Sequence, residues 1–202
     1  NYRGWSDLVG YKTPVWNGLQ YYTTWDKNNV NSNTTRNSTY WENLLTYEKS
    51  FGKITPKFYL AYVKGTGALN SGITKDSVLT AAAKATMNNI TIGGSYSDQK
   101  TDTTPTIKKK IQRLVGSAKY TVGKCYAAAT FGQAKVDLGT AKNATDKATH
   151  TQIAVGVGHQ FFKSLEVRAT YANYKYKEDD LSLEGTQGNK ANIFMLGALL
   201  SF

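Results

Sequence analysis

A period of two in the hydrophobic pattern is the feature that most limits the fold. Residues 165–171 place Leu, Val, Ala and Tyr at alternate positions, with Glu, Arg and Thr between them. Residues 90–97 and 112–122 alternate in the same way. Successive side chains of an extended chain point to opposite faces, so the pattern predicts strands with unlike faces. No segment shows a convincing helical stripe, and we predict that the alanine-rich residues 77–87 also form a strand.

Short and long connections alternate along the chain, and together they delimit eleven strands. An up-and-down meander has this rhythm when its two ends face different surroundings, as in transmembrane β-barrels with short periplasmic turns and longer external loops. We therefore expect an all-β fold, a transmembrane antiparallel up-and-down β-barrel, because lipid leaves no partner for an open backbone edge. The short turns are expected at residues 13–18, 49–55, 87–89, 122–124 and 161–164, and the long polar stretches at 26–38, 65–76, 98–109, 137–148 and 177–189.

The composition agrees with strands in a membrane. Charged residues are 19% of the chain, below the roughly 25% typical of soluble domains. Aromatic residues are 12%, with 14 Tyr, and such rings suit the boundary between lipid and water. No stretch approaches the roughly 18 apolar residues of a membrane helix. The single cysteine, Cys125, excludes an internal disulfide framework and a cysteine-based metal cage.

Signatures of enzymes and of cofactor binding fail. No Gly-x-Ser-x-Gly motif is present, and residues 116–124 are spaced too widely for a phosphate loop. His150 and His159 have opposite parity, so one strand cannot aim both at a metal ion. We therefore expect no enzyme, no cofactor, no metal ion and no catalytic residue. The net charge of +11 suits nucleic acid, anionic membranes or anionic solutes. Nucleic acid is not expected, because aromatic residues share faces with aliphatic ones.

The carboxy-terminal strand is apolar to its last residue, whereas the termini of soluble proteins are normally polar. One face of this strand carries only apolar side chains, and the other carries Gly197 and Ser201. We expect the apolar face to lie against lipid. Its residues are Phe194, Leu196, Ala198, Leu200 and Phe202.

Three places in the chain resemble outer-membrane proteins. The terminal strand resembles the carboxy-terminal signal that the outer-membrane assembly machinery recognises, carried by the five apolar residues just named. Residues 7–19 resemble a turn of the Gram-negative general porins, in which a strand ending in Tyr runs into Thr-Pro, an aromatic residue, Asn-Gly and the next strand. Residues 161–174 are similar to the penultimate turn of that family.

The resemblance implies a barrel of about 16 strands, a homotrimer and passive diffusion of small hydrophilic solutes through the outer membrane of a Gram-negative bacterium. In the family, the turn that residues 13–18 resemble follows the sixth strand. We therefore expect residues 1–202 to be a single transmembrane barrel domain that lacks its first strands and its pore-folding loop. Outer-membrane lipid and lipopolysaccharide are the expected surroundings.

Charged residues on the polar face of the strands are candidates for lining the pore, because lumen-facing charges set selectivity. The alternative is that several lie near a rim and are only solvated, and a register error of one residue would reverse the face. The basic excess predicts a weak anion preference. The candidates are Lys12, Lys84, Arg113, Lys119, Arg168 and Glu166, with Glu48 as a further one.

Other interpretations stay open at this point. The run Lys108–Lys110 is interpreted as facing water, with binding of lipopolysaccharide phosphates as the alternative. A smaller monomeric channel of about 12 strands, specific for an acidic sugar or a similar solute, is the second hypothesis for the whole chain. A soluble β-barrel binding protein is the third.

Overall fold

The computed structural model describes residues 6–30, 36–67, 75–102, 108–137, 147–162, 164–179 and 187–200. Within these ranges, no helix is long and apolar enough to cross a membrane. The strands are β1 (Ser6–Lys12), β2 (Leu19–Val30), β3 (Arg36–Glu48), β4 (Ile54–Gly67), β5 (Lys75–Met87), β6 (Ile90–Asp102), β7 (Lys108–Val122), β8 (Cys125–Asp137), β9 (Lys147–Phe162), β10 (Leu165–Asp179) and β11 (Gln187–Leu200).

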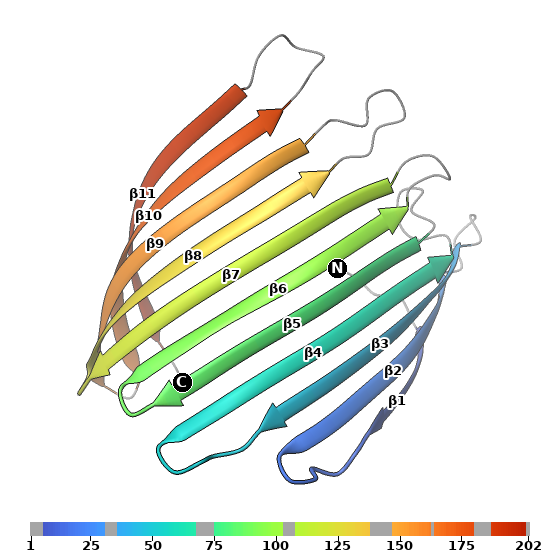
Figure 1. Ribbon diagram of the computed structural model, residues 1–202, viewed down its shortest axis with the longest axis horizontal. Helices are drawn as coiled ribbons and strands as arrows, with labels where there is room; N and C mark the ends of the chain where they lie inside the picture. The colour runs from blue at the N-terminus through green and yellow to red at the C-terminus, as the bar shows by residue number, and fades with distance from the viewer. Residues whose placement is uncertain are drawn as a thin grey trace.

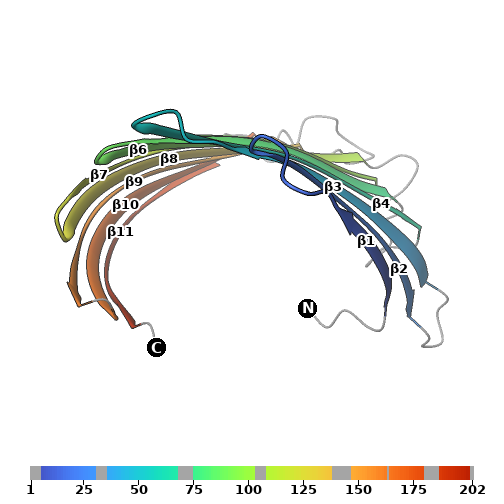
Figure 2. The same cartoon turned by 90° about the horizontal axis from the view of Figure 1, so that it is seen from below.

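All eleven strands form one sheet in the order of the sequence, and each is antiparallel to the strand before it (Figure 1). The predicted number of strands and the up-and-down order are confirmed, and residues 77–87 lie in strand β5 as expected. The sheet curves into an arch (Figure 2). Strands β1 and β11 are its two edges and do not pair with each other in the described part of the chain.

The short turns lie at one end of the sheet, and their sequences explain their shape. Trp16 and Leu19 exchange two backbone hydrogen bonds of 2.8 Å around the pair Asn17 and Gly18. Asn17 has a φ of 50° and Gly18 a φ of 89°. A two-residue hairpin turn needs positive φ at both central positions, which is why Asn-Gly is favoured there. The predicted turn at residues 13–18 is confirmed.

Several strands extend into polar stretches that were predicted to be connections between strands. Strand β2 runs to Val30 and strand β9 starts at Lys147, although polar stretches were predicted to connect strands at residues 26–38 and 137–148. The prediction of these boundaries was wrong because hydrophobicity reports contact with lipid, whereas a strand needs only backbone hydrogen bonds to its neighbour. The ladder therefore continues past the apolar part of each strand.

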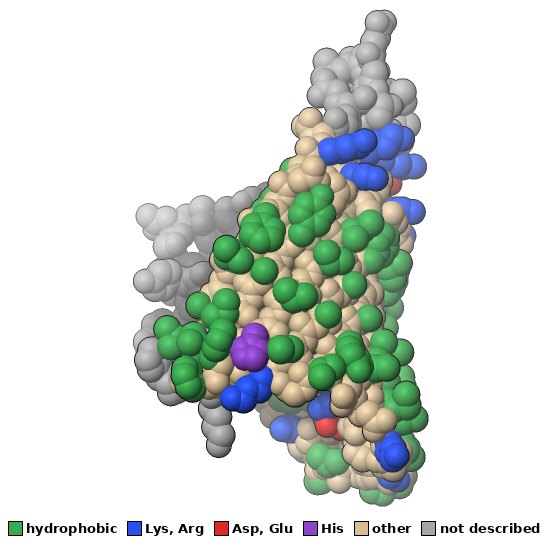
Figure 3. Space-filling view, turned by 90° about the vertical axis from the view of Figure 1, so that its left-hand side faces the viewer, with side chains coloured by type: hydrophobic (Ala, Val, Ile, Leu, Met, Phe, Trp, Pro, Cys, Tyr) green, Lys and Arg blue, Asp and Glu red, His purple; other side chains and the backbone are tan. Residues whose placement is uncertain are grey.

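One face of the sheet carries most of the large apolar side chains, and the other carries only a few, such as Ile193, Met195 and Leu199. Ladder partners share a face, so an apolar row can be followed from strand to strand. One such row is formed by Leu196, Ala169, Val157, Ala127, Tyr120 and Ile90. Figure 3 shows hydrophobic side chains covering this side of the molecule, which Figure 2 shows to be the convex side of the arch.

The structure has almost no hydrophobic core. Among the described residues, the only buried hydrophobic side chains are Ala148 and Ala172, and Leu196 is 73% exposed. Both alanines lie on the concave face, as do the buried Thr24 and Thr101, because curvature crowds the side chains of that face together. Large apolar residues left in water would forgo about 1.5–3 kcal/mol each, so the convex face is built for an apolar solvent.

Gly18 is predicted to be irreplaceable at its turn. A Cβ there would lie 2.5 Å from the backbone oxygen of Glu48, and φ is already left-handed. Gly52 also has positive φ, but a Cβ there meets nothing within 4 Å. Both Gly→Ala changes carry a backbone penalty of about 1–2 kcal/mol, and Gly18→Ala adds about 1–3 kcal/mol for the clash. Urea unfolding of the protein in detergent micelles measures the loss of stability in both variants. Equal losses would contradict the predicted clash at Gly18.

Candidate functional site

The charged residues singled out in the sequence lie on the concave face. Arg168 precedes Ala169 and Lys119 precedes Tyr120, so both point away from the convex apolar row. Lys12 and Arg113 belong to one concave ladder row, which the register traces from strand β1 to strand β7. The full concave set is Lys12, Glu48, Lys84, Arg113, Lys119, Glu166 and Arg168.

Only part of this set is brought together. Lys119 and Glu166 are joined through Tyr126, which sequence reasoning did not identify. The Nζ atom of Lys119 lies 3.9 Å from the centroid of the Tyr126 ring. The hydroxyl of Tyr126 donates a hydrogen bond of 2.8 Å to Oε1 of Glu166. Glu48 forms an ion pair with Lys57 near the short-turn end of the sheet, and Lys84 is the ladder partner of Lys57.

Two glycines let long side chains lie beside the concave wall. Gly158 is the ladder partner of Tyr126, and a Cβ on it would lie 2.4 Å from two ring carbons of that tyrosine. The ring therefore lies across strand β9 and its hydroxyl reaches strand β10. A Cβ on Gly197 would lie 3.6 Å from Nε of Arg168, so this side chain runs beside strand β11. We call these two positions the glycine slots.

A hollow of about 460 Å³ lies on the concave face between Tyr126 and Arg168, the two side chains that lie over the glycine slots. Its polar walls are Tyr126 and Arg168, and its floor is made of small residues together with Met195. The small residues are Ala128, Thr130, Ala154, Gly156, Thr170 and Gly197. Small floor residues keep the wall thin at this point, and the only charge in the lining is that of Arg168.

Acidic residues share the concave face with the basic ones, and sequence reasoning missed them. Asp26, Glu42 and Asp76 lie on strands β2, β3 and β5, towards the end opposite the short turns. Asp76 accepts a hydrogen bond of 2.9 Å from the hydroxyl of Thr101. Asp26 is 8% exposed. Asp26 and Asp76 lie in polar stretches that were predicted to connect strands, whereas Glu42 lies inside a predicted strand, where its parity could have been read from the sequence.

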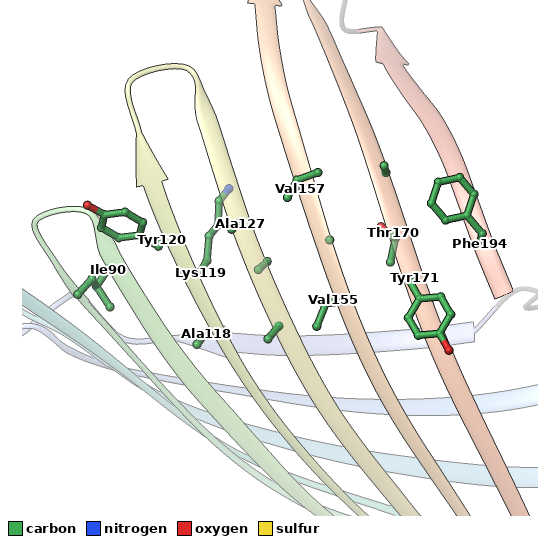
Figure 4. A pocket seen from close by; sticks show the side chains of 14 residues that line it. Ile90, Ala118, Lys119, Tyr120, Ala127, Val155, Val157, Thr170, Tyr171 and Phe194 are labelled. Carbon is green, nitrogen blue, oxygen red and sulfur yellow. The ribbon is translucent and has the colours of Figure 1, made fainter. Parts of the chain in front are cut away.

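The convex face carries the residues of the predicted assembly signal. Phe194, Leu196, Ala198 and Leu200 share this face, and Phe194 and Leu196 are 66% and 73% exposed. Phe202 lies outside the described residues. A shallow apolar hollow of about 680 Å³ also lies here. In Figure 4, Ile90 and Tyr120 border it on one side and Tyr171 and Phe194 on the other, with alanines between them.

The chemistry of the described residues offers no metal centre, since no three of their His, Cys, Asp or Glu side chains gather to hold an ion. The Sγ atom of Cys125 lies 2.9 Å from Nδ1 of His159 on the convex face, whereas His150 lies on the concave face. The two histidines thus sit on opposite sides of the sheet. The arrangement as a whole is a wall with a charged, hollowed inside and an apolar outside.

Comparison with solved structures shows the same fold. OmpT of Vibrio cholerae, an outer membrane protein, matches with a TM-score of 0.66 and 14% identity, over 96% of this chain and 63% of that one. An anion-selective porin from Comamonas acidovorans matches with a TM-score of 0.59 and 19% identity, over 96% and 57%. The chain therefore spans less than two thirds of the length of either structure. No curated protein matches the chain.

A family model described as Gram-negative porin matches residues 1–179. The match covers strands β1 to β10, and so takes in the glycine slot at Gly158 and the concave charges. The chain therefore belongs to the Gram-negative porins, and its place is the bacterial outer membrane.

Proposed function

We propose that the concave face lines a water-filled channel through which small hydrophilic solutes and ions diffuse passively across the outer membrane, without catalysis. The observation that carries this proposal is the separation of the two faces. The predicted charged residues lie on the concave face, whereas the large apolar rows lie on the convex face. A wall of this kind stabilises water on one side and lipid on the other.

The proposed pore-lining residues are Lys12, Lys84, Arg113, Lys119, Glu166 and Arg168, with Glu48 beside them. Basic residues prevail on strands β7 to β10, where Arg113, Lys119 and Arg168 face the lumen. Acids prevail on strands β2 to β5 towards the long-loop end. Because the two signs oppose each other, the proposed anion preference is weak.

We also propose that further strands close the barrel, to about 16 in all, and that barrels assemble into a homotrimer. Unpaired backbone groups at the edges of β1 and β11 would each cost several kcal/mol in hydrocarbon, which supports closure. The alanine-floored hollow on the convex face offers a surface on which a neighbouring subunit could approach closely. Recognition of the terminal strand by the assembly machinery is part of the same proposal, carried over from the resemblance to general porins.

The glycine slots are proposed to set the width of the channel near its short-turn end. With Gly158 beneath it, the Tyr126 ring lies flat on the wall, and its hydroxyl is held by Glu166. A ring without this slot would have to project into the lumen. Gly158 and Glu166 therefore both keep the Tyr126 ring against the wall, and so keep the cross-section of the channel open.

Lipopolysaccharide is proposed as the lipid partner at the long-loop end, through a belt of convex lysines. Two pairs of these lysines are direct ladder partners on the convex face: Lys100 with Lys110, and Lys175 with Lys190. Like charges directly opposite each other are destabilising, so an external anion between them would stabilise the sheet. The three lysines of the run 108–110 do not share a face: Lys109 faces the concave side, whereas Lys108 and Lys110 face outwards.

The lipid A part of lipopolysaccharide fits this belt. Long loops of outer-membrane barrels are extracellular, so the belt lies in the outer leaflet, where lipid A presents phosphates. Convex lysines follow the apolar band on several strands, and Lys and Arg side chains gather beyond this band in Figure 3. The lysines of the belt are Lys64, Lys100, Lys110, Lys135, Lys175 and Lys190. Asp98 lies 3.8 Å from Lys110 and offsets part of its charge.

The channel and its selectivity are tested in planar bilayers. We expect discrete conductance steps and, in a KCl gradient, a reversal potential displaced modestly towards that of chloride. Removing charge with Arg113→Gln and Lys119→Gln moves the reversal potential towards that of potassium, whereas Asp26→Asn and Glu42→Gln move it the other way, because lumen charges attract ions of opposite sign. A cation-selective wild type would refute the anion preference, and no conductance at all would refute the channel.

Gly158→Ala is predicted to lower the single-channel conductance, because its methyl group displaces the Tyr126 ring into the lumen. The double change Gly158→Ala with Tyr126→Ala restores the conductance, since no ring remains to project. Gly116→Ala on the convex face of strand β7 is the control for the change of glycine itself, because a Cβ there meets nothing within 4 Å and points away from the lumen. A double variant as narrow as the single one would show that the slot does not control width.

Changing Lys175 and Lys190 to Gln is predicted to weaken binding of bisphosphorylated lipid A by about tenfold or more, because each lysine near an anionic surface contributes about 1 kcal/mol. Native mass spectrometry of the protein in detergent micelles measures the bound lipid. The matched control changes Lys53 and Lys124, which lie in short turns, to Gln and keeps the wild-type affinity. Equal binding of lipid A without phosphates would count against the belt.

A further inference from the structure

A second hollow on the concave face, of about 390 Å³, combines one cation with several rings. This inference rests on the proposed channel and concerns what the channel wall binds. The hollow lies within the size range of small-molecule sites. The concave residues that define it are Arg113, Gly132, Ala134, His150, Tyr174 and Tyr176.

The register places these residues in a defined order across four strands. Arg113 on β7 is the ladder partner of Ala134 on β8, which pairs with His150 on β9, which pairs with Tyr176 on β10. Neighbouring strands lie about 4.8 Å apart, so Arg113 and His150 stand about 10 Å apart across the small side chain of Ala134. Gly132, the next concave residue of β8, extends the same low floor. The gap between Arg113 and His150 is about the length of one six-membered ring that carries a carboxylate substituent.

One wall of the hollow carries the cation. Arg113 is exposed, and its Nη1 donates a hydrogen bond of 3.4 Å to Oε1 of Gln99, which steadies the guanidinium and leaves other N–H groups for a ligand. No Asp or Glu is among the lining residues, and Arg113 is the only Lys or Arg of the lining whose side chain lies on the concave face. The guanidinium of Arg113 therefore faces the hollow without a carboxylate in the lining to neutralise it. A planar guanidinium matches a carboxylate by two parallel hydrogen bonds.

The opposite wall carries the rings. The ring centroids of His150 and Tyr176 lie 4.5 Å apart at an interplanar angle of 48°. Beside them, Nε2 of Gln152 donates a hydrogen bond of 3.2 Å to the hydroxyl of Tyr174, which fixes that tyrosine. Exposed ring faces bind flat, weakly polar surfaces. A solute that reaches both walls therefore needs a ring and an anionic group at its end.

We propose that this hollow is a binding station on the channel wall for small carboxylates that carry a ring. Arg113 takes the carboxylate, the pair His150 and Tyr176 takes the ring, and Ala134 and Gly132 provide the space between them. Aromatic acids and sugar acids share this chemistry. A station of this kind raises the local concentration of such solutes above that of simple anions of equal charge.

The test is the block of single-channel current by benzoate, glucuronate and acetate, each measured against the open current of the same protein. Benzoate, glucuronate or both are expected to reduce the current at concentrations at least about tenfold lower than acetate. The acid that does so identifies the ring as aromatic or as a sugar. Acetate acting equally would overturn the proposal.

Variants assign the block to the hollow. Arg113→Gln is expected to weaken it about tenfold, because a hydrogen bond to a charged group is lost. Ala134→Leu fills the space, weakens the block to a similar extent and leaves both walls in place. Lys53→Gln, which removes a charge in a short turn away from the hollow, changes the block less than twofold. A loss with Lys53→Gln as large as that with Arg113→Gln would reduce the site to a general electrostatic effect and overturn it, as would an unchanged block with Ala134→Leu.

The outcomes separate this inference from the proposed function. Discrete conductance without selective block overturns the binding station and leaves the channel intact. Absence of conductance in the wild-type protein refutes the channel itself. Conductance steps from each variant show that it has folded, so a loss of block in a conducting variant reports on the hollow.

Discussion

The backbone of a strand must find a hydrogen-bond partner on each side, and in hydrocarbon no water replaces a missing one. This constraint governs the whole molecule. Each of the inner strands, β2 to β10, is paired along both edges, and the sheet is continuous over eleven strands. Once the ladders are fixed, every side chain must point to one of two faces. The apolar and charged faces are thus consequences of backbone pairing, and the near-absence of a hydrophobic core follows from them.

Curvature turns these two faces into different chemical surfaces. On the convex side the side chains diverge, so residues such as Leu196 remain largely exposed. On the concave side they converge, so small residues there leave hollows and larger ones must lie along the wall. Tyr126 shows the result, because its ring needs the bare backbone of Gly158 and its hydroxyl reaches a third strand. Glycines on this wall therefore shape the surface as much as the charged residues do.

Much of the fold could be predicted from the sequence because the periodicity of two is a local property. The strand number and the turn at Asn17 and Gly18 depend on neighbouring residues alone, and both are confirmed. The strand ends could not be placed, because polar residues such as those near Val30 pair as well as apolar ones do. Acids on these extensions, among them Asp26, were therefore missed as concave residues.

Alternation along each strand is enough to place Arg113, Lys119 and Arg168 on the polar face of their own strands, because the apolar residues occupy the positions between. Which residues of different strands meet is known only from the folded sheet. Cross-strand register is set by pairing along the whole ladder, so it joins Tyr126 to Glu166 over Gly158, and Arg113 to His150 and Tyr176 across Ala134. Such neighbours are far apart in the chain, and no local pattern in the sequence records their distance.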